Sequence, residues 1–177
     1  KIEAVKNPSI LIAGCGTGQH SIATATRFKK CEVLAVDLSL TSLAYAKRKT
    51  KELGLENIEY MQADILDLSK LNKRFDIIES VGVLHHMDDP MTGWKVLADT
   101  LKPGGLMLIG LYSKLGRNGV VKIQKDLKKI IDRSDDNAIK SFRNSVIASE
   151  KEFDKKIRSY EYFYSWTELK DLLFPVQ

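Results

Sequence analysis

Short apolar runs recur along the first part of the chain, each bounded by turn residues or polar residues. Runs of this length are typical of strands that are buried on both faces of a parallel sheet. The pattern predicts strands over residues 10–13, 32–37, 58–63, 75–80 and 106–109.

Helical periodicity fills the intervals between these runs. Helices are predicted over residues 17–29, after Ser39 as N-cap, over residues 66–71, and from Asp89 and Pro90 to the turn at residues 103–105. The expected buried faces are Ile22, Ala23, Ala25 and Phe28 in the first helix, Leu40, Leu43 and Ala44 in the second, and Met91, Trp94, Leu97, Ala98 and Leu101 in the last. The alternation predicts an α/β fold with a mostly parallel sheet, helices on both faces, and ligands at the carboxyl ends of the strands.

After Tyr112 the pattern becomes helical, and no strand pattern follows. Apolar positions predict one helix through Val120, Ile123, Leu127 and Ile130, a second through Phe142, Val146, Ser149 and Phe153, and a short third that starts at a capping box over residues 165–168. We expect residues 1–113 to form the core and residues 114–177 a helical insertion or lid of the same domain. The cluster of aromatic side chains within residues 160–166 is expected to pack this lid onto the sheet, or else to contact substrate. We expect the chain to be a fragment that lacks the last strands of its fold.

A glycine-rich turn follows the first strand directly, with Gly14, Gly16 and Gly18 at alternate positions. Glycine there lets bare backbone approach a ligand, which points to a nucleotide-like cofactor. Asp37 ends the second strand, where a carboxylate accepts the hydroxyls of a ribose. The dinucleotide fingerprint requires a third glycine where this chain has Gln19, so an NAD-dependent oxidoreductase is the less favoured interpretation.

The third strand is followed by Asp64, and a Lys-Pro-Gly-Gly turn at residues 102–105 precedes the fifth. In this order the motifs of residues 8–112 resemble the class I S-adenosylmethionine-dependent methyltransferases, which have a Rossmann-like sheet. Residues 13–20, 35–47, 109–113 and 171–177 are similar to bacterial methyltransferase domains found beside tetratricopeptide repeats. The resemblance implies S-adenosylmethionine as cofactor and allows flanking repeats in the full-length protein.

The same resemblance assigns cofactor contacts residue by residue. The glycines of the turn and Gln19 lie near the methionine and ribose parts, Asp37 takes the ribose hydroxyls, Leu38 packs on adenine, Asp64 and Ile65 receive its amino edge, and Ser80 and Val81 contact the methionine moiety. Asp37 has the alternative role of a helix-capping carboxylate beside Ser39, and Asp64 that of a turn residue. The family commonly carries an acidic residue two positions before the first glycine, where this chain has Ile12.

The loop after the fourth strand holds His85 and His86, near the transferred methyl in related enzymes. We select His85 as the catalytic residue, a general base that assists an oxygen or nitrogen acceptor. Loop packing is the alternative for both histidines, and we expect no metal. Some quinone-pathway O-methyltransferases place two Glu and a His in this loop, but here Gly82 and His85 replace the Glu residues.

Composition adds three expectations. The chain has 177 residues, 44% hydrophobic and 29% charged, with neither a bilayer-length apolar run nor a leader pattern, and we expect a cytoplasmic protein without membrane contact. Cys15 and Cys31 lie at opposite ends of a predicted helix, which argues against a disulfide. Residues 113–159 carry a net charge of +6, which indicates a solvated helical face or an anionic partner.

Two functional classes remain open at this point. The first is an active methyltransferase whose acceptor is a small molecule, a sugar or a protein. We do not expect a nucleic-acid acceptor, because the Asn/Asp-Pro-Pro-Tyr loop and the Pro-Cys nucleophile are absent. The second is a non-catalytic module that binds S-adenosylmethionine or S-adenosylhomocysteine for regulation or interaction, motivated by Ile12 and by the expected lack of the last strands.

Overall fold

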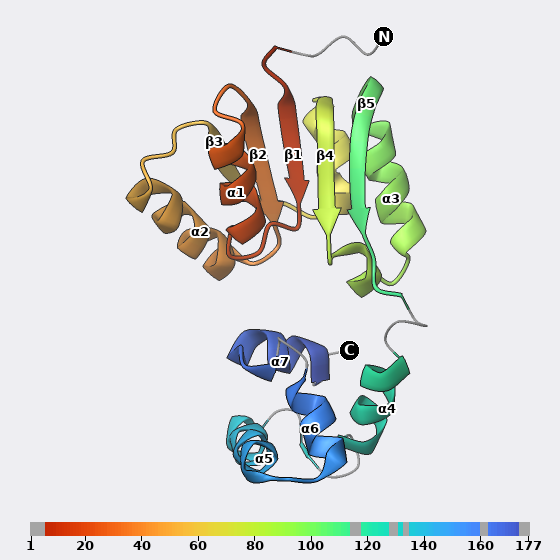
Figure 1. Cartoon of the computed structure of the whole chain (residues 1–177). Helices are drawn as coiled ribbons and strands as arrows, with labels where there is room; N and C mark the ends of the chain where they lie inside the picture. The colour runs from red at the N-terminus through yellow and green to blue at the C-terminus, as the bar shows by residue number, and fades with distance from the viewer. Residues whose placement is uncertain (1–5, 114–117, 128–130, 133–134, 160–162, 174–177) are drawn as a thin grey trace. The chain divides into compact units, whose positions relative to one another are not determined.

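The computed structural model describes residues 6–113, 118–127, 131–132, 135–159 and 163–173. The chain forms two compact units, Lys1–Tyr112 and Ser113–Gln177. The first contains a sheet and the second is helical among the residues described (Figure 1). The interpretation of residues 114–177 as a lid that belongs to the same domain stays a prediction.

The first unit is built on a parallel sheet with the strand order β3-β2-β1-β4-β5 (Figure 1). The strands are β1 (Ser9–Ala13), β2 (Glu32–Asp37), β3 (Ile58–Gln62), β4 (Phe75–Val81) and β5 (Leu101–Gly110), and all four pairings are parallel. The order reverses between β1 and β4, where ligands bind in sheets of this kind. The predicted fold class is therefore confirmed.

Helices cover both faces of this sheet. On one face lie α1 (Gln19–Arg27) and α2 (Leu40–Glu52), above a core cluster that includes Ile10 and Ile12. On the other lie the 3₁₀ turns η1 (Ile65–Leu71) and η2 (Leu84–His86) and the helix α3 (Pro90–Asp99), above Leu11 and Ile78. Ser39 and Asp89 cap α2 and α3 as predicted, because each side chain accepts a backbone N–H of the first turn.

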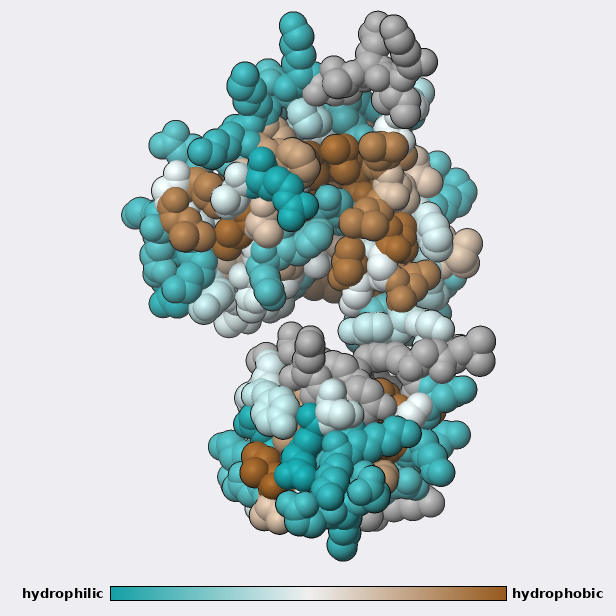
Figure 2. Space-filling model, viewed as in Figure 1, coloured by the Kyte–Doolittle hydropathy of each residue, from teal (hydrophilic) through white to brown (hydrophobic). Residues whose placement is uncertain are grey.

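The two faces of β5 differ in their exposure. Met107 and Ile109 pack against the core cluster on the α3 side. The alternate residues Leu106 and Leu108 are 61% and 51% exposed, and Figure 2 shows hydrophobic side chains gathered over β4 and β5 on the face toward the viewer. Within the described part of the first unit, this face of the sheet is covered by helices mainly on its β1–β3 side (Figure 1).

The predicted buried faces of the helices are partly wrong. In α1 the buried residues are Ser21, Thr24 and Ala25, whereas Phe28 is 46% exposed. In α2 they are Leu43, Ala46 and Thr50, while Leu40 is exposed. In α3 they are Gly93 and Leu97, while Met91 and Trp94 are exposed. Small side chains are buried because they let a helix lie close to its neighbours: a Cβ at Gly93 would lie 2.5 Å from Met87 Sδ.

The fifth strand also begins earlier than predicted. Leu101 pairs with Phe75, and the register then shifts so that Ile77 pairs with Leu106. The Lys-Pro-Gly-Gly turn is therefore an irregularity inside β5. Gly105 is required there, since a Cβ would lie 2.8 Å from the carbonyl oxygen of Asp76.

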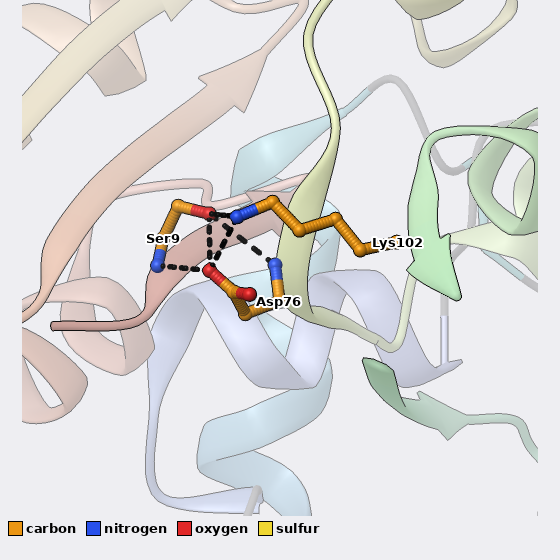
Figure 3. A network of polar contacts seen from close by, with 3 residues as sticks. All are labelled: Ser9, Asp76 and Lys102. Atoms are coloured by element: carbon orange, nitrogen blue, oxygen red, sulfur yellow. Dashed lines mark hydrogen bonds and ion pairs between the residues drawn. The ribbon is translucent and has the colours of Figure 1, made fainter. Parts of the chain in front are cut away.

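A polar network joins the amino ends of three strands, at the opposite end from the predicted site (Figure 3). Asp76 Oδ2 accepts hydrogen bonds from the backbone N–H and Oγ of Ser9, at 2.9 and 2.7 Å, and pairs with Lys102 Nζ at 2.8 Å. Hydrogen bonds from Lys102 and Ser9 lower the pKa of Asp76 from 3.8 to about 2. The network fixes β1, β4 and β5 relative to one another.

Asp76→Asn is expected to lower the free energy of unfolding by about 2 kcal/mol at pH 7. A carboxylate whose pKa is lower in the folded than in the unfolded protein stabilises the fold by about this amount when the pKa falls from 3.8 to about 2. The folded pKa lies below the ordinary one, so the stabilisation is complete above about pH 4 and is lost as the pH falls toward 2. Urea denaturation should therefore show a difference in unfolding free energy between wild type and variant that becomes smaller below pH 4. A difference that persists unchanged at low pH would refute the assignment, and Asp67→Asn, at an exposed ion pair, is the control.

The second unit has a core of its own. Its helices are α4 (Asn118–Leu127), α5 (Asp136–Ala148), α6 (Glu152–Arg158) and α7 (Trp166–Leu173). Their shared cluster of buried residues is Val120, Ile123, Leu127, Ile139, Val146, Ile157, Phe163, Leu169 and Leu173. Phe163 therefore packs inside this unit. Ile130, Tyr160 and Tyr162 lie outside the described residues.

One predicted helix of this unit is in fact two. The positions from Phe142 to Phe153 are divided between α5 and α6, with an extended residue, Ser149, at the break. The Arg158 guanidinium donates to the carbonyl oxygens of Ile147 and Ser149, at 2.8 and 2.9 Å, and satisfies the end of α5. The predicted start of the last helix is confirmed, as α7 begins directly after Ser165. None of the helices in the described ranges is long and apolar enough to cross a bilayer.

Candidate functional site

The glycine turn lies between β1 and α1, at the carboxyl end of the sheet. Gly14, Gly16 and Gly18 have φ values of 81°, 51° and 88°, a region that L side chains rarely adopt. The N–H groups of Gly14 and Cys15 donate to the carbonyl oxygen of Val36, at 2.8 and 2.9 Å, and hold the turn against β2. Gly18 is the N-cap of α1 and supplies no side-chain acceptor to the first N–H groups of this helix.

Asp37 connects the glycine turn to α2. Its Oδ2 accepts the N–H of Gly16 at 2.7 Å, and its Oδ1 accepts the N–H of Ser39 at 2.8 Å. The alternative considered for Asp37 is therefore present in part, although Ser39 is the N-cap of α2. Each carboxylate oxygen has a second lone pair, so these bonds leave Asp37 able to accept ligand hydroxyls.

Asp64 follows β3 and caps η1. Its Oδ1 accepts the N–H of Leu66 at 2.9 Å, which is the turn role considered as an alternative. Beside these two carboxylates Leu38 is 65% exposed, an unusual position for a large apolar side chain at the end of a strand. An exposed leucine flanked by acceptors fits a flat aromatic ligand with polar edges.

A pocket of about 540 Å³ joins these elements, within the size range of small-molecule sites. It is lined by Gly14, Asp37, Leu38, Ala63, Asp64, Ile65, Leu66, Val83, His86, Met87, Asp88, Asp89 and Thr92. Five of the predicted cofactor residues are thus brought together: Gly14, Asp37, Leu38, Asp64 and Ile65. The loop after β4 was expected near the transferred methyl because of His85 and His86, but its lining residues Val83, Met87, Asp88, Asp89 and Thr92 were not predicted as part of the site.

The other predicted residues border the site without lining this pocket. Gly16 and Gly18 belong to the turn, and Gln19 is exposed on the first turn of α1. Ser80 is 1% exposed at the end of β4, and its Oγ has no hydrogen-bond partner among the described residues. Val81 is 49% exposed.

The two histidines of the loop after β4 lie differently. His86 lines the pocket, whereas the ring of His85 contacts the rings of His86 and Tyr112 at tilted angles of 46° and 51°, with each ring centroid 4.2 Å away. His85 therefore packs against aromatic rings beyond the ends of β4 and β5. Its catalytic role stays a prediction.

The electrostatic character of the pocket is negative, because Asp37, Asp64, Asp88 and Asp89 all line it. A site lined by charges of one sign favours a ligand of the opposite charge. Burial and the nearby Asp37 raise the pKa of the Cys15 thiol to about 12, so this buried cysteine in the turn is neutral and unreactive at pH 7. Within the described part of the chain, no group of three or more His, Cys, Asp or Glu side chains is arranged to hold a metal ion.

Known proteins are similar to this chain in sequence. The chain is 34% identical over 101 residues to (S)-coclaurine N-methyltransferase of Papaver somniferum, which covers 57% of this chain and 28% of that protein. It is 36% identical over 114 residues to a ubiquinone biosynthesis O-methyltransferase of Coxiella burnetii, which covers 64% and 46%. The chain therefore spans less than half the length of either relative.

A solved structure extends the likeness along the chain. PKMT2 from Rickettsia typhi, in complex with AdoHcy, matches with a TM-score of 0.75 and 21% identity, over 99% of this chain and 36% of that one. At this identity the match shows the fold alone. The family model described as a methyltransferase domain matches residues 10–105, the segment that holds the glycine turn, the carboxylates and the pocket. The chain belongs to this family of methyltransferase domains.

Proposed function

We propose that this chain is an S-adenosylmethionine-dependent methyltransferase that transfers a methyl group to an oxygen or nitrogen of its acceptor. The observation that carries the proposal is one pocket, at the carboxyl end of the sheet, which joins the glycine turn to Asp37 and Asp64. The family match and the named N- and O-methyltransferase relatives support it. The acceptor is a small molecule, a sugar or a protein.

The residues present fit the cofactor. A Cβ at Gly16 would meet nothing within 4 Å, so the turn faces open space there. Asp37 would take the ribose hydroxyls, Leu38 would pack on adenine, and Asp64 with Ile65 would receive its amino edge. The buried hydroxyl of Ser80, at the end of β4, is available for the methionine part.

The chemistry asks little of the protein beyond alignment. Bound S-adenosylmethionine supplies a methyl carbon that is activated by the adjacent positive sulfur. The chain then has to hold an acceptor in line with that carbon, which is an effect of proximity and orientation. His85 is proposed as the general base for an acceptor that carries a proton, and His86, which lines the pocket, is the other candidate.

The helical second unit is proposed to act in acceptor choice, as an insertion or lid. Its support is compositional, since the excess positive charge of the chain falls on residues 113–159. The association with tetratricopeptide repeats is likewise a proposal that rests on the resemblance of short segments. A regulatory module that binds the cofactor without turnover is the second candidate, favoured by Ile12 at the position of the family's acid.

Methyl transfer should be tested with the full-length protein and S-adenosylmethionine labelled in the methyl group. We expect label to appear in a small-molecule or protein fraction of a cell extract, and not in nucleic acid. Cofactor binding without any labelled product would favour the non-catalytic module.

His85→Ala should lower the rate at saturating cofactor without changing cofactor affinity, and an unchanged rate would remove His85 from the mechanism.

A further inference from the structure

Glu79 is a nearly buried carboxylate that the proposed chemistry does not use. Its side chain is 15% exposed, on β4, directly before Ser80. In the sheet register Glu79 is the partner of Ile12 on β1. Paired residues of parallel strands share a face, so Glu79 lies beside the position where the resemblance leads one to expect an acid.

The contacts of Glu79 connect the sheet to α1. Its Oε2 lies 2.8 Å from His20 Nε2 and accepts a hydrogen bond from Thr24 Oγ1 at 3.1 Å. His20 belongs to the first turn of α1, and Thr24 lies one turn later on the buried side of the helix. One carboxylate thus joins the end of β4 to the beginning of the helix that follows the glycine turn.

The other side-chain anchor of the first turn of α1 among the described residues is the buried Ser21, whose hydroxyl donates to the carbonyl oxygen of Gly18 at 3.1 Å. The N-cap of this helix is a glycine without a side chain, and its first turn contains no acidic residue. A negative charge near the amino end of a helix is favourable, and Glu79 provides one from the neighbouring strand. An anchor that is fixed by the sheet also holds the position of the glycine turn, because Gly18 and the first turn of α1 are consecutive.

We propose that Glu79 is a positioning residue for the cofactor. It holds the first turn of α1, through His20 and Thr24, and so keeps the glycine turn in the shape that accepts the methionine end. It does from β4 what the acid missing at Ile12 would do from β1. The inference rests on the proposed function, and it assigns Glu79 no contact with the acceptor.

The test is calorimetric titration of the chain with S-adenosylhomocysteine, together with the melting temperature of each variant. Glu79→Gln keeps the shape of the side chain but removes its charge, and should raise the Kd about tenfold. His20→Ala should raise it as well. The double variant should bind no worse than Glu79→Gln alone, since residues that act through one contact are not additive.

Asp76→Asn is the matched control, because Asp76 is a second partly buried carboxylate on β4, at the far end of the strand. It should lower the melting temperature and leave the Kd within twofold. An increase above twofold in Glu79→Gln, not shared by Asp76→Asn, supports the inference. A Kd within twofold of wild type, or an equal increase in Asp76→Asn, overturns it. If Glu79→Gln does not fold, the His20→Ala variant, which changes an exposed side chain, decides by the same twofold criterion in Kd. If the wild-type protein does not bind S-adenosylhomocysteine, the result refutes the proposed function and not this inference.

Discussion

Asp37→Ala is expected to raise the Kd for S-adenosylhomocysteine about 100-fold, since it removes two charge-assisted bonds to ligand hydroxyls. The loss has a second component in the protein itself. Asp37 holds Gly16 and Ser39 through their N–H groups, so the variant also removes one of the hydrogen bonds that hold the glycine turn against β2. Calorimetric titration measures the effect directly.

The matched control for this variant is Asp99→Ala, which removes an exposed carboxylate of α3 that pairs with Lys95 on the same helix. It should leave the affinity unchanged. Asp37→Asn is expected to lose affinity to an intermediate extent, because its amide oxygen can still accept one of the N–H groups of Gly16 and Ser39 while its NH2 group cannot accept the other. If Asp37→Ala binds as tightly as Asp99→Ala, Asp37 does not hold the ribose.

Gly14→Ala is expected to cost about 3 kcal/mol of unfolding free energy, the sum of a left-handed alanine and a steric overlap. A Cβ at Gly14 would lie 2.3 Å from Cγ2 and 2.6 Å from Cγ1 of Val83. Relief requires movement of Val83, which lines the same pocket, so binding of S-adenosylhomocysteine should be lost as well. Urea denaturation and calorimetry measure the two losses.

Gly54→Ala provides the comparison for the backbone contribution alone. Gly54 has a φ of 65° and open space around its missing Cβ, at the end of α2. Its cost should be about 1 kcal/mol, with cofactor affinity unchanged. Equal costs in the two variants would show that the close approach of Gly14 to Val83 has no energetic consequence.

The sheet could be predicted because its signals are local. Each strand is an apolar run bounded by a turn, and the residues just past the ends, such as Asp37 and Asp64, meet at one edge whenever the strands are parallel. The glycine turn needed no tertiary information either, because three glycines at alternate positions after a strand are typical of a turn with left-handed backbone angles. Because both signals are local, five of the residues that line the pocket could be predicted from the sequence: Gly14, Asp37, Leu38, Asp64 and Ile65.

The helix faces were predicted less well, because hydrophobic periodicity counts large side chains. Close packing instead selects small ones, such as Thr24, Ala25 and Gly93. The polar Thr24 is buried because Glu79 accepts its hydroxyl hydrogen bond, a partner 55 residues away in sequence. Such a pairing cannot be read from a window of neighbouring residues.

The second wall of the pocket depends on tertiary contacts in the same way. The segment from Val83 to Thr92 turns back over the strand ends through η2, and Met87 is held against Gly93 of α3. The sequence indicates that this segment follows a strand, and the resemblance places it near the transferred methyl, but neither indicates which of its side chains face the pocket. Its path depends on how α3 packs, so His86, and not the predicted His85, lines the pocket.

The most direct test of the cofactor site is an NMR titration of the chain with S-adenosylhomocysteine, followed through assigned backbone amides. Binding at the carboxyl end of the sheet predicts saturable shifts for Gly14, Gly16, Leu38 and Ile65, and none for Ser9 or Lys102 at the opposite end. Shifts confined to the Ser9 end, or a spectrum unchanged by excess ligand, would contradict a cofactor site built on the glycine turn and Asp37.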